Sequence, residues 1–405
     1  MSYTGKAIGM YIFGGSATIA HLQCGWNIDK ILEMTDDMIY NNSYHFVRNY
    51  PNISIKNPSE WNNDAFLNEL KSEQYDLLFT NNPCSGLSRI NRNANVDQKA
   101  NNRFYEVFNV VDIIKPKVFL MENAPSLVTI GTPILQDMIK QLGNNYKFSI
   151  IRDEAGNHGV PMKRCRTLVI GWNKEYFNNI PIINMKKQNK VTIRDVFNKI
   201  DYNNGNNLSE VIDDNWSYLK KYYKYVKTDS SVLRMCAERY IDIAPLLNKN
   251  QKNAVLTAKN KLSNNQNIWD KSPYRLNFDK RCGSMTSLTR FIHPTEDRDL
   301  YVREYAAIMG YPESFKFYEG CNCNEVQCVA QGVPVNFIKY ISNEIIRILN
   351  TNYKYMDGEI IYQNHISKDY RLFNNINDFL VLPNLHNYYK ITRSSENLVG
   401  ELNDE

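Results

Sequence analysis

Residues 7–22 read AIGMYIFGGSATIAHL. The first seven residues of this stretch are mostly apolar and predict a short buried strand, which runs directly into the glycines at 14 and 15. Residues 19–22 then predict the start of a helix. A strand, a glycine turn and a helix in this order are typical of the first unit of a nucleotide-binding α/β domain.

The residues that follow continue the alternation of apolar runs and helical patterns. Strands are expected at 28–34, 75–80, 117–121, 148–152 and 167–172, and helices at 103–114 and 134–142. Such alternation predicts a doubly wound, Rossmann-like α/β domain. Several polar side chains come just past the ends of these strands, where ligands bind in sheets of this kind.

The pattern changes after residue 172. Asn, Lys and Tyr dominate 173–279 and the alternation is lost, but order returns later, with an amphipathic helix expected at 335–349. We therefore expect a large α/β domain formed by 1–190 plus 325–349, a smaller domain at 191–324 and a polar C-terminal extension at 350–405.

The composition limits the classes of protein to which the chain can belong. Its 405 residues suffice for two or three domains, and its net charge of +5 permits nucleic-acid binding without requiring it. No run approaches the ~18 apolar residues of a membrane span, and residues 1–6 lack the features of a secretion signal. The eight cysteines are scattered, which predicts reduced thiols in a cytoplasmic protein.

A cysteine follows one of the expected strands directly. Asn82, Pro83 and Cys84 come after the apolar run at 75–80. A cysteine exposed at the end of a strand can act as a nucleophile once neighbouring groups stabilise its thiolate. An inert core thiol is the alternative interpretation of a single cysteine.

Charged side chains accompany two other strands. Glu122 follows the run at 117–121, and Arg164 and Arg166 stand two residues apart where the run at 167–172 begins. A buried carboxyl can exchange a proton with a substrate, and two arginines on one face of a strand can hold an anion. A capped helix start and a solvated strand end are the alternative interpretations.

Three further cysteines lie close together near the end of the patterned sequence, at Cys321, Cys323 and Cys328. Structural zinc sites usually draw on Cys-x2-Cys pairs and a fourth ligand, neither of which is evident here. We therefore interpret these residues as reduced thiols in a loop and assign no metal site, while a zinc site at the three cysteines stays open as the alternative interpretation.

Taken in order, these motifs resemble those of the DNA cytosine-5 methyltransferases. The nucleophile motif of that family, Pro-Pro-Cys-Gln-Gly-Phe-Ser, is similar to residues 82–88, and its Glu-Asn-Val is similar to residues 122–124. The other matching stretches are the cofactor loop at 13–17, the acidic Glu33, and residues 159–166, 290–298, 302–306, 309–315 and 330–334. The resemblance covers about 1–200 and 272–348, or roughly two thirds of the chain.

The resemblance implies methylation of carbon 5 of cytosine in double-stranded DNA. It makes Cys84 the nucleophile that attacks carbon 6, while Glu122 bonds N3 and the exocyclic amine of the base. Arg166 would hold the carbonyl oxygen of the base, and Arg164 would support the loop or a phosphate. A base inside a duplex must be flipped out to reach such a site, and residues 85–103 would close over it.

The same resemblance implies the cofactor and the roles of the domains. The cofactor is S-adenosylmethionine, bound by the large, catalytic domain, and residues 191–324 form the target-recognition domain. No protein partner is implied, and we expect a monomer in the cytoplasm of a bacterial or phage-infected cell. The implied cofactor-binding residues are Phe13, Gly15, Ser16, Ala17, Glu33, Met34, Asn57, Pro83 and Gln331.

The sequence departs from the family pattern around both pockets. The departures are Ala17 for the second glycine of the cofactor loop, Asn57 for the acid near adenine, Asn81 and Asn82 for the usual Gly and Pro, Ser85 for Gln and Gln331 for Asn. Three alternatives stay open: a tRNA cytosine-5 methyltransferase, transfer of a different group to the base, and a non-catalytic DNA-binding relative. Residues 200–280 lack the Cys-Phe-Thr element of the tRNA enzymes, which favours the DNA enzyme.

Overall fold

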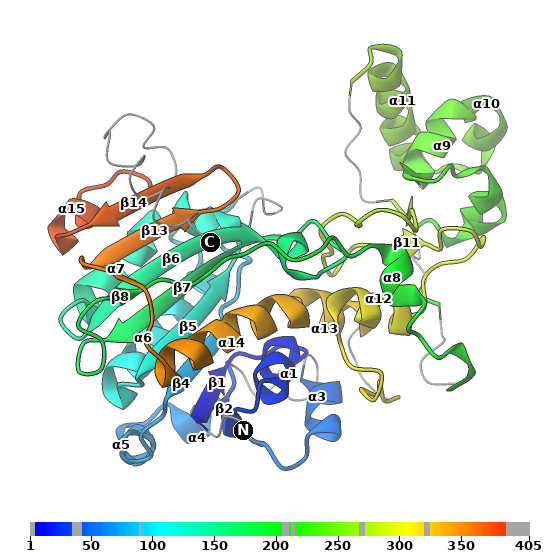
Figure 1. Ribbon diagram of the computed structural model, residues 1–405. Coiled ribbons are helices and arrows are strands. Elements are labelled where there is room, and N and C mark those ends of the chain that lie inside the picture. The colour runs from blue at the N-terminus through cyan, green and yellow to red at the C-terminus, as the bar shows by residue number, and fades with distance from the viewer. Residues whose placement is uncertain are drawn as a thin grey trace. The chain divides into compact units, whose positions relative to one another are not determined.

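The computed structural model describes residues 5–34, 43–88, 91, 93–204, 210–211, 215–266, 272–319 and 325–385 (Figure 1). The chain divides into two compact units. Unit 1 comprises Met1–Gly159, Arg164–Asn189 and Gly332–Glu405, and unit 2 comprises Val160–Lys163 and Lys190–Gln331. No helix in the described ranges is long and apolar enough to cross a membrane.

Unit 1 is built on a sheet that has nine strands in the described part of the chain, in the order β14-β13-β6-β7-β5-β4-β1-β2-β3. Neighbouring strands from β3 to β5 run parallel, whereas β7 runs antiparallel to both β5 and β6. This parallel-rich sheet confirms the predicted Rossmann-like architecture. The bounds are β1 Lys6–Met10, β2 Asn27–Leu32, β3 Ser54–Lys56, β4 Leu77–Asn81, β5 Val118–Asn123, β6 Tyr146–Glu154, β7 Cys165–Asn173, β13 Ile360–Asn364 and β14 Asp369–Phe373.

Helices cover both faces of this sheet, because alternate residues of its strands are apolar on both faces. One face packs against α5 (Asp64–Ser72), α6 (Asn102–Ile114), α7 (Thr132–Leu142) and α15 (Ile376–Leu380) in a single apolar core. The other face lies beneath α1 (Ser16–Gln23) and α14 (Val335–Asn350), which pack against each other (Figure 1). Unit 1 also has the short helices α3 (Tyr44–Asn49) and α4 (Pro58–Trp61), and a small ladder of β8 (Ile180–Pro181) with β12 (Tyr355–Met356).

The segment after residue 350, which the sequence predicts as a polar extension, begins as part of the sheet. Strand β13 pairs in parallel with β6 and antiparallel with β14. Ile360 and Tyr362 are fully buried in the core. Two strands of five residues among polar neighbours give too few hydrophobic repeats to be recognised in the sequence.

Unit 2 has a small sheet of β9 (Ser230–Ser231), β10 (Tyr274–Arg275) and β11 (Phe291–Ile292). Its helices are α8 (Ile193–Phe197), α9 (Val232–Glu238), α10 (Tyr240–Ile243), α11 (Lys249–Ser263), α12 (Val302–Met309) and α13 (Glu325–Gln331). Residues 325–331 are expected in the large domain, but they form α13, which belongs to unit 2 and packs against α12.

Buried charges supplement the apolar core of unit 2. The Arg275 guanidinium donates to the carbonyls of Tyr223, Val226 and His293 at 2.8 Å each. Arg298 donates to both carboxylate oxygens of the fully buried Glu304, at 2.8 and 2.9 Å. These guanidinium groups join segments that the short strands alone would hold weakly.

Candidate active site

The candidate site lies at one edge of the sheet in unit 1. Strands β1, β2, β4 and β5 run parallel, so their carboxyl ends meet at the same edge. The cofactor loop, Glu33, the Cys84 loop and Glu122 follow or end these four strands. The sheet thus gathers four of the sequence motifs, which are separated by up to about a hundred residues in the chain, at one edge.

The cofactor loop turns sharply between β1 and α1. Phe13 has a φ of 50° and Gly15 a φ of 84°, and both values lie in the left-handed region. A side chain at Gly15 would also overlap the ring of Phe46. Glycine is therefore required at position 15 on two counts. Ser16 and Ala17 are buried in the first turn of α1, which the loop leads into.

Two hydroxyl groups at this helix start have no protein partner. Ser16 Oγ and Thr18 Oγ1 are buried and make no hydrogen bond within the described residues. A buried hydroxyl without a partner is costly unless a ligand satisfies it. The amino end of a helix also favours a carboxylate such as that of a methionine moiety.

Glu33 lies just beyond β2 and is fully buried. Its carboxylate accepts hydrogen bonds from Ser43 Oγ at 2.8 Å and from the Met34 amide at 3.3 Å. Burial nevertheless raises the pKa of Glu33 to about 7. A carboxylate in this position fits the hydroxyl donors of a ribose, and together with the Ser16 and Thr18 hydroxyls it fits S-adenosylmethionine.

The nucleophile candidate stands on a loop that its neighbours hold firmly. Cys84 is exposed, and its carbonyl accepts from the Leu87 amide at 3.1 Å. Before it, Asn82 accepts from Thr80 Oγ1 at 2.9 Å and donates to the Arg103 carbonyl at 3.3 Å. The loop is thus tied both to β4 and to the start of α6.

A chain of hydrogen bonds joins Tyr11, which lies between β1 and the cofactor loop, to helix α6. The Tyr11 hydroxyl donates to Glu106 Oε2 at 2.6 Å, and Arg103 Nη1 lies 2.5 Å from Glu106 Oε1. Burial, followed by the Glu106 contact, raises the pKa of Tyr11. Arg103 is the last residue of the 85–103 loop that we expect to close over the base, and its guanidinium is held by Glu106. Arg89 and Arg92 of that loop lie outside the described residues.

Glu122 receives a partner from each flanking strand. Arg166 Nε of β7 lies 2.6 Å from Glu122 Oε1, and Asn81 Nδ2 of β4 donates to Oε2 at 2.9 Å. All three side chains are nearly buried. The registers place Asn81 directly opposite Glu122, and Thr167 opposite Asn123. The carboxylate orientation is therefore fixed by three adjacent strands.

The remaining candidates have other surroundings. Arg164 is buried before β7 and donates to the Gly332 carbonyl at 2.7 Å, so it has a different partner from Arg166. Asn57 caps α4, where its backbone N–H donates to Glu60 Oε2 at 2.9 Å. Met34 packs against the core of unit 1, and Pro83 is half-buried beside Cys84. Gln331 ends α13 in unit 2, and its Oε1 is buried with no hydrogen bond to any residue that the structure describes.

The sequence does not predict that Asn81 and Ser43 contribute to the site. Asn81 is noted only as a departure from the family pattern, and Ser43 has no motif at all. The signal for Asn81 was its place as the last residue of a buried strand beside the strand of Glu122. The Ser43 contact depends on the path of a chain segment that no sequence pattern specifies.

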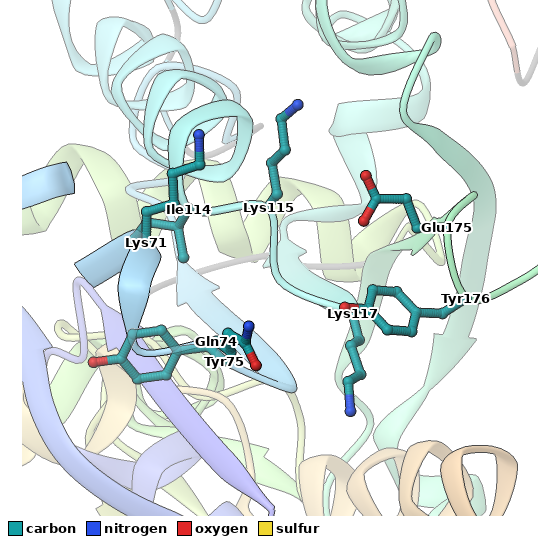
Figure 2. A pocket seen from close by; sticks show the side chains of 8 residues that line it. All are labelled: Lys71, Gln74, Tyr75, Ile114, Lys115, Lys117, Glu175 and Tyr176. Carbon is teal, nitrogen blue, oxygen red and sulfur yellow. The ribbon is translucent and has the colours of Figure 1, made fainter. Parts of the chain in front are cut away.

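A cavity lies at the opposite edge of the sheet from the motifs. This cavity of about 310 Å³ lies near the amino ends of β4 and β5, and Figure 2 shows the side chains that line it. They include Lys71, Lys115, Lys117 and the rings of Tyr75 and Tyr176. Lys117 is paired with Asp76 at 2.7 Å. None of the sequence motifs contributes to this cavity.

The cysteine cluster cannot be tested at all its positions. Cys328 is buried in α13, whereas Cys321 and Cys323 lie outside the described residues. Within the described ranges, no group of three or more His, Cys, Asp or Glu side chains could hold a metal ion.

Comparison with protein families identifies the class of enzyme to which the chain belongs. The family model for C-5 cytosine-specific DNA methylases matches residues 30–347. The chain belongs to the C-5 cytosine-specific DNA methylase family. It is a methyltransferase that uses S-adenosylmethionine to methylate carbon 5 of cytosine in DNA, as the resemblance of its motifs predicts.

Named relatives agree with this assignment. The type II methyltransferase M1.HgaI of Avibacterium volantium is 24% identical over 69% of this chain and 81% of its own length. The type II methyltransferase M.FnuDI of Fusobacterium nucleatum is 23% identical over 71% of this chain and 82% of its own length. Both names are those of restriction–modification methyltransferases, to which this methylase is similar.

Solved structures share its fold. A protein described as a DNA modification methyltransferase encoded within an E. coli prophage matches with a TM-score of 0.59 and 18% identity, over 85% of this chain and 99% of its own. The S. pombe Dnmt2 methyltransferase matches with a TM-score of 0.52 and 12% identity, over 86% of this chain and all of its own. At these identities the match establishes the fold of the methylase.

Proposed function

We propose that this methylase acts through a covalent adduct between Cys84 and a cytosine flipped out of duplex DNA. The observation that carries the proposal is the pairing of Glu122 with Arg166 and Asn81 at the sheet edge where Cys84 is exposed. Carbon 5 of cytosine is a poor nucleophile, and it becomes reactive once a thiolate has added to carbon 6. Cys84 and Glu122 supply what this addition needs, which is an exposed thiol and a carboxylate held in a fixed orientation.

In the proposed reaction the Cys84 sulfur bonds to carbon 6 while Glu122 hydrogen-bonds N3 and the exocyclic amine. Arg166 holds Glu122 in place and brings a cation to the carbonyl side of the base. Bound S-adenosylmethionine supplies the methyl cation that carbon 5 accepts. Solvent water then takes the proton from carbon 5, the electrons of that bond re-form the double bond to carbon 6, and the sulfur leaves as the Cys84 thiolate, which frees the methylated base.

The cofactor would be held by the groups at the ends of β1 and β2. The Ser16 and Thr18 hydroxyls and the amino end of α1 suit its carboxylate, and Glu33 suits its ribose hydroxyls. Phe13, Gly15 and Ala17 shape the turn against which it would lie. We assign Met34, Asn57, Pro83 and Gln331 to the same site on the resemblance of their positions to the family pattern.

Unit 2 would provide target recognition. Tyr218 and Tyr225 are among its exposed large side chains, and Lys221 and Lys224 are exposed beside them. Lysines suit DNA phosphates and tyrosine rings suit stacking with bases. We further propose that the enzyme is a DNA (cytosine-5-)-methyltransferase of restriction–modification type that acts as a monomer in the cytoplasm. Arg164 would support the active-site loop through its hydrogen bond to the Gly332 carbonyl.

Mass spectrometry of nucleosides tests this mechanism. Plasmid DNA from cells that express the protein should contain 5-methylcytosine, and Cys84→Ser should abolish it. Cys24→Ser is the matched control, because Cys24 caps the far end of α1 and its loss should leave methylation intact. A different mass increment on cytosine would mean transfer of another group. Modified tRNA with unmodified DNA would overturn the DNA assignment, and an active Cys84→Ser would overturn the covalent mechanism.

A further inference from the structure

Asn81 contacts the carboxylate at the centre of the proposed site. It is the last residue of β4 and is 3% exposed. Its Nδ2 donates to Glu122 Oε2 at 2.9 Å. The contact does not depend on a flexible loop, because the parallel pairing of β4 with β5 sets Asn81 directly opposite Glu122.

The contact complements the one from the opposite side. Arg166 approaches Oε1 from β7, and Asn81 approaches Oε2 from β4. A carboxylate offers about four lone-pair positions for hydrogen bonds. Two partners within the sheet therefore leave positions free for a base, while neither oxygen can turn away without losing a partner.

The two partners differ in what they can do when the carboxyl gains a proton. A guanidinium can only donate, so it favours the ionised form alone. A primary amide carries both a donor and an acceptor, and half a turn about its last bond exchanges them. Asn81 can therefore donate to the ionised carboxylate through Nδ2, or accept from the protonated carboxyl through Oδ1. Glycine, the usual residue at this position of the family pattern, can do neither.

We propose that Asn81 is a positioning residue for the transfer reaction. Its amide holds the Glu122 carboxyl in one orientation in both protonation states, so that the group stays aligned while it exchanges a proton with the base. Asn81 thereby takes over an orienting role that the backbone alone cannot fill. This inference rests on the proposed function, since it assigns Glu122 to the base.

The test compares steady-state methylation by the wild type and three variants on one DNA duplex, from about pH 6 to about pH 8.5. Asn81→Ala removes the amide, and Asn81→Asp replaces it with an isosteric carboxyl. Asn68→Asp adds the same charge at an exposed site on α5, away from every motif, and serves as the matched control. Thermal unfolding establishes that each variant is folded. If Asn81→Ala does not fold, Asn81→Ser takes its place, because its side chain is polar but too short to reach Glu122.

Asn81→Ala should lower kcat about ten- to a hundredfold, the range expected for a hydrogen bond to a charged group. The KM values for DNA and cofactor should change by less than about twofold, because the contact orients a reacting group rather than binding substrate. Asn81→Asp should lose more activity at high pH and regain it as pH falls, because one of two adjacent carboxyls then takes a proton and donates as the amide did. Asn68→Asp should leave kcat and both KM values within about twofold of the wild type.

Two results would overturn the inference. The first is a kcat of Asn81→Ala within about twofold of the wild type, and the second is an Asn81→Asp activity whose ratio to the wild type does not change with pH. A wild-type protein that transfers no group to the duplex would overturn the proposed function instead, and this inference with it. The wild-type reaction in the same assay therefore separates the two failures.

Discussion

The buried Glu33 makes cofactor binding sensitive to pH near neutrality. Its pKa is raised to about 7 by burial, and its proposed task is to accept hydrogen bonds from ribose hydroxyls. Only the ionised carboxylate can accept with both oxygens. About a tenth of the Glu33 carboxyls are ionised at pH 6 and about nine tenths at pH 8. Affinity for the cofactor should therefore rise about tenfold over this interval.

The same pKa predicts an opposite effect on stability. Glu33 binds its proton more tightly in the folded chain than in the unfolded chain, where a glutamate titrates near its model value of 4.5. Folding stability is then lost as pH rises from about 4.5 to about 7. Between pH 5 and pH 8 the wild type should lose about 2–3 kcal/mol relative to Glu33→Gln, which has no charge to bury.

Calorimetric titration with S-adenosylhomocysteine, the demethylated form of the cofactor, measures the first effect at pH 6, 7 and 8. Glu33→Gln should bind more weakly and without this pH dependence. Glu73→Gln is the control, because ion pairing with Lys6 and Lys30 outweighs partial burial and lowers the pKa of Glu73 to about 2. Chemical denaturation of the cofactor-free protein at about pH 5 and pH 8 measures the second effect. A wild-type affinity that changes less than twofold between pH 6 and pH 8 would refute the assignment of Glu33.

Three further predictions follow from other contacts. Arg166→Ala should abolish methylation and lower the free energy of unfolding in urea by about 3–5 kcal/mol, because it leaves Glu122 as a buried charge without its cation. Arg166→Lys keeps a cation, so it should lose less activity and less stability. Gly15→Ala should weaken cofactor binding and cost at least about 1–2 kcal/mol, because φ is 84° and Phe46 occupies the space; an unchanged unfolding midpoint would contradict this. Arg275→Met should destabilise unit 2 and weaken DNA retention in gel-shift assays, while S-adenosylhomocysteine binding to unit 1 persists; equal loss of both would argue against separate roles.

Most of the sheet in unit 1 could be predicted from the sequence, for a physical reason. Strands buried on both faces, such as Leu77–Asn81 and Val118–Asn123, are continuous apolar runs that end in polar residues. Their parallel arrangement follows from the helices between them, and it places Cys84 and Glu122 at one edge. The motifs along the chain therefore carried the position of the site as well as its residue types.

The contacts that complete the site could not be predicted in the same way. The pairing of Asn81 with Glu122 depends on the register of two strands, and the pairing of Arg166 depends on β7 running antiparallel beside β5. The sequence alone does not fix either feature. The sequence does not predict strands β13 and β14, because β13 is buried by pairing with β6, which is distant in the chain, and β14 pairs in turn with β13.

The hairpin of β13 and β14 has a consequence for how the protein behaves at high concentration. It pairs with β6 from Phe148 to Arg152, where alternate residues would otherwise present free main-chain N–H and C=O groups on one side. Such an open edge invites pairing with a second chain, which is the usual start of aggregation. A chain cut after Asn350 would retain every motif of the proposed active site. It would nevertheless leave the edge of β6 without a partner strand. The hairpin replaces this edge with that of β14, a strand of five residues that carries Asp369 and Arg371, and short, charged edge strands resist such pairing.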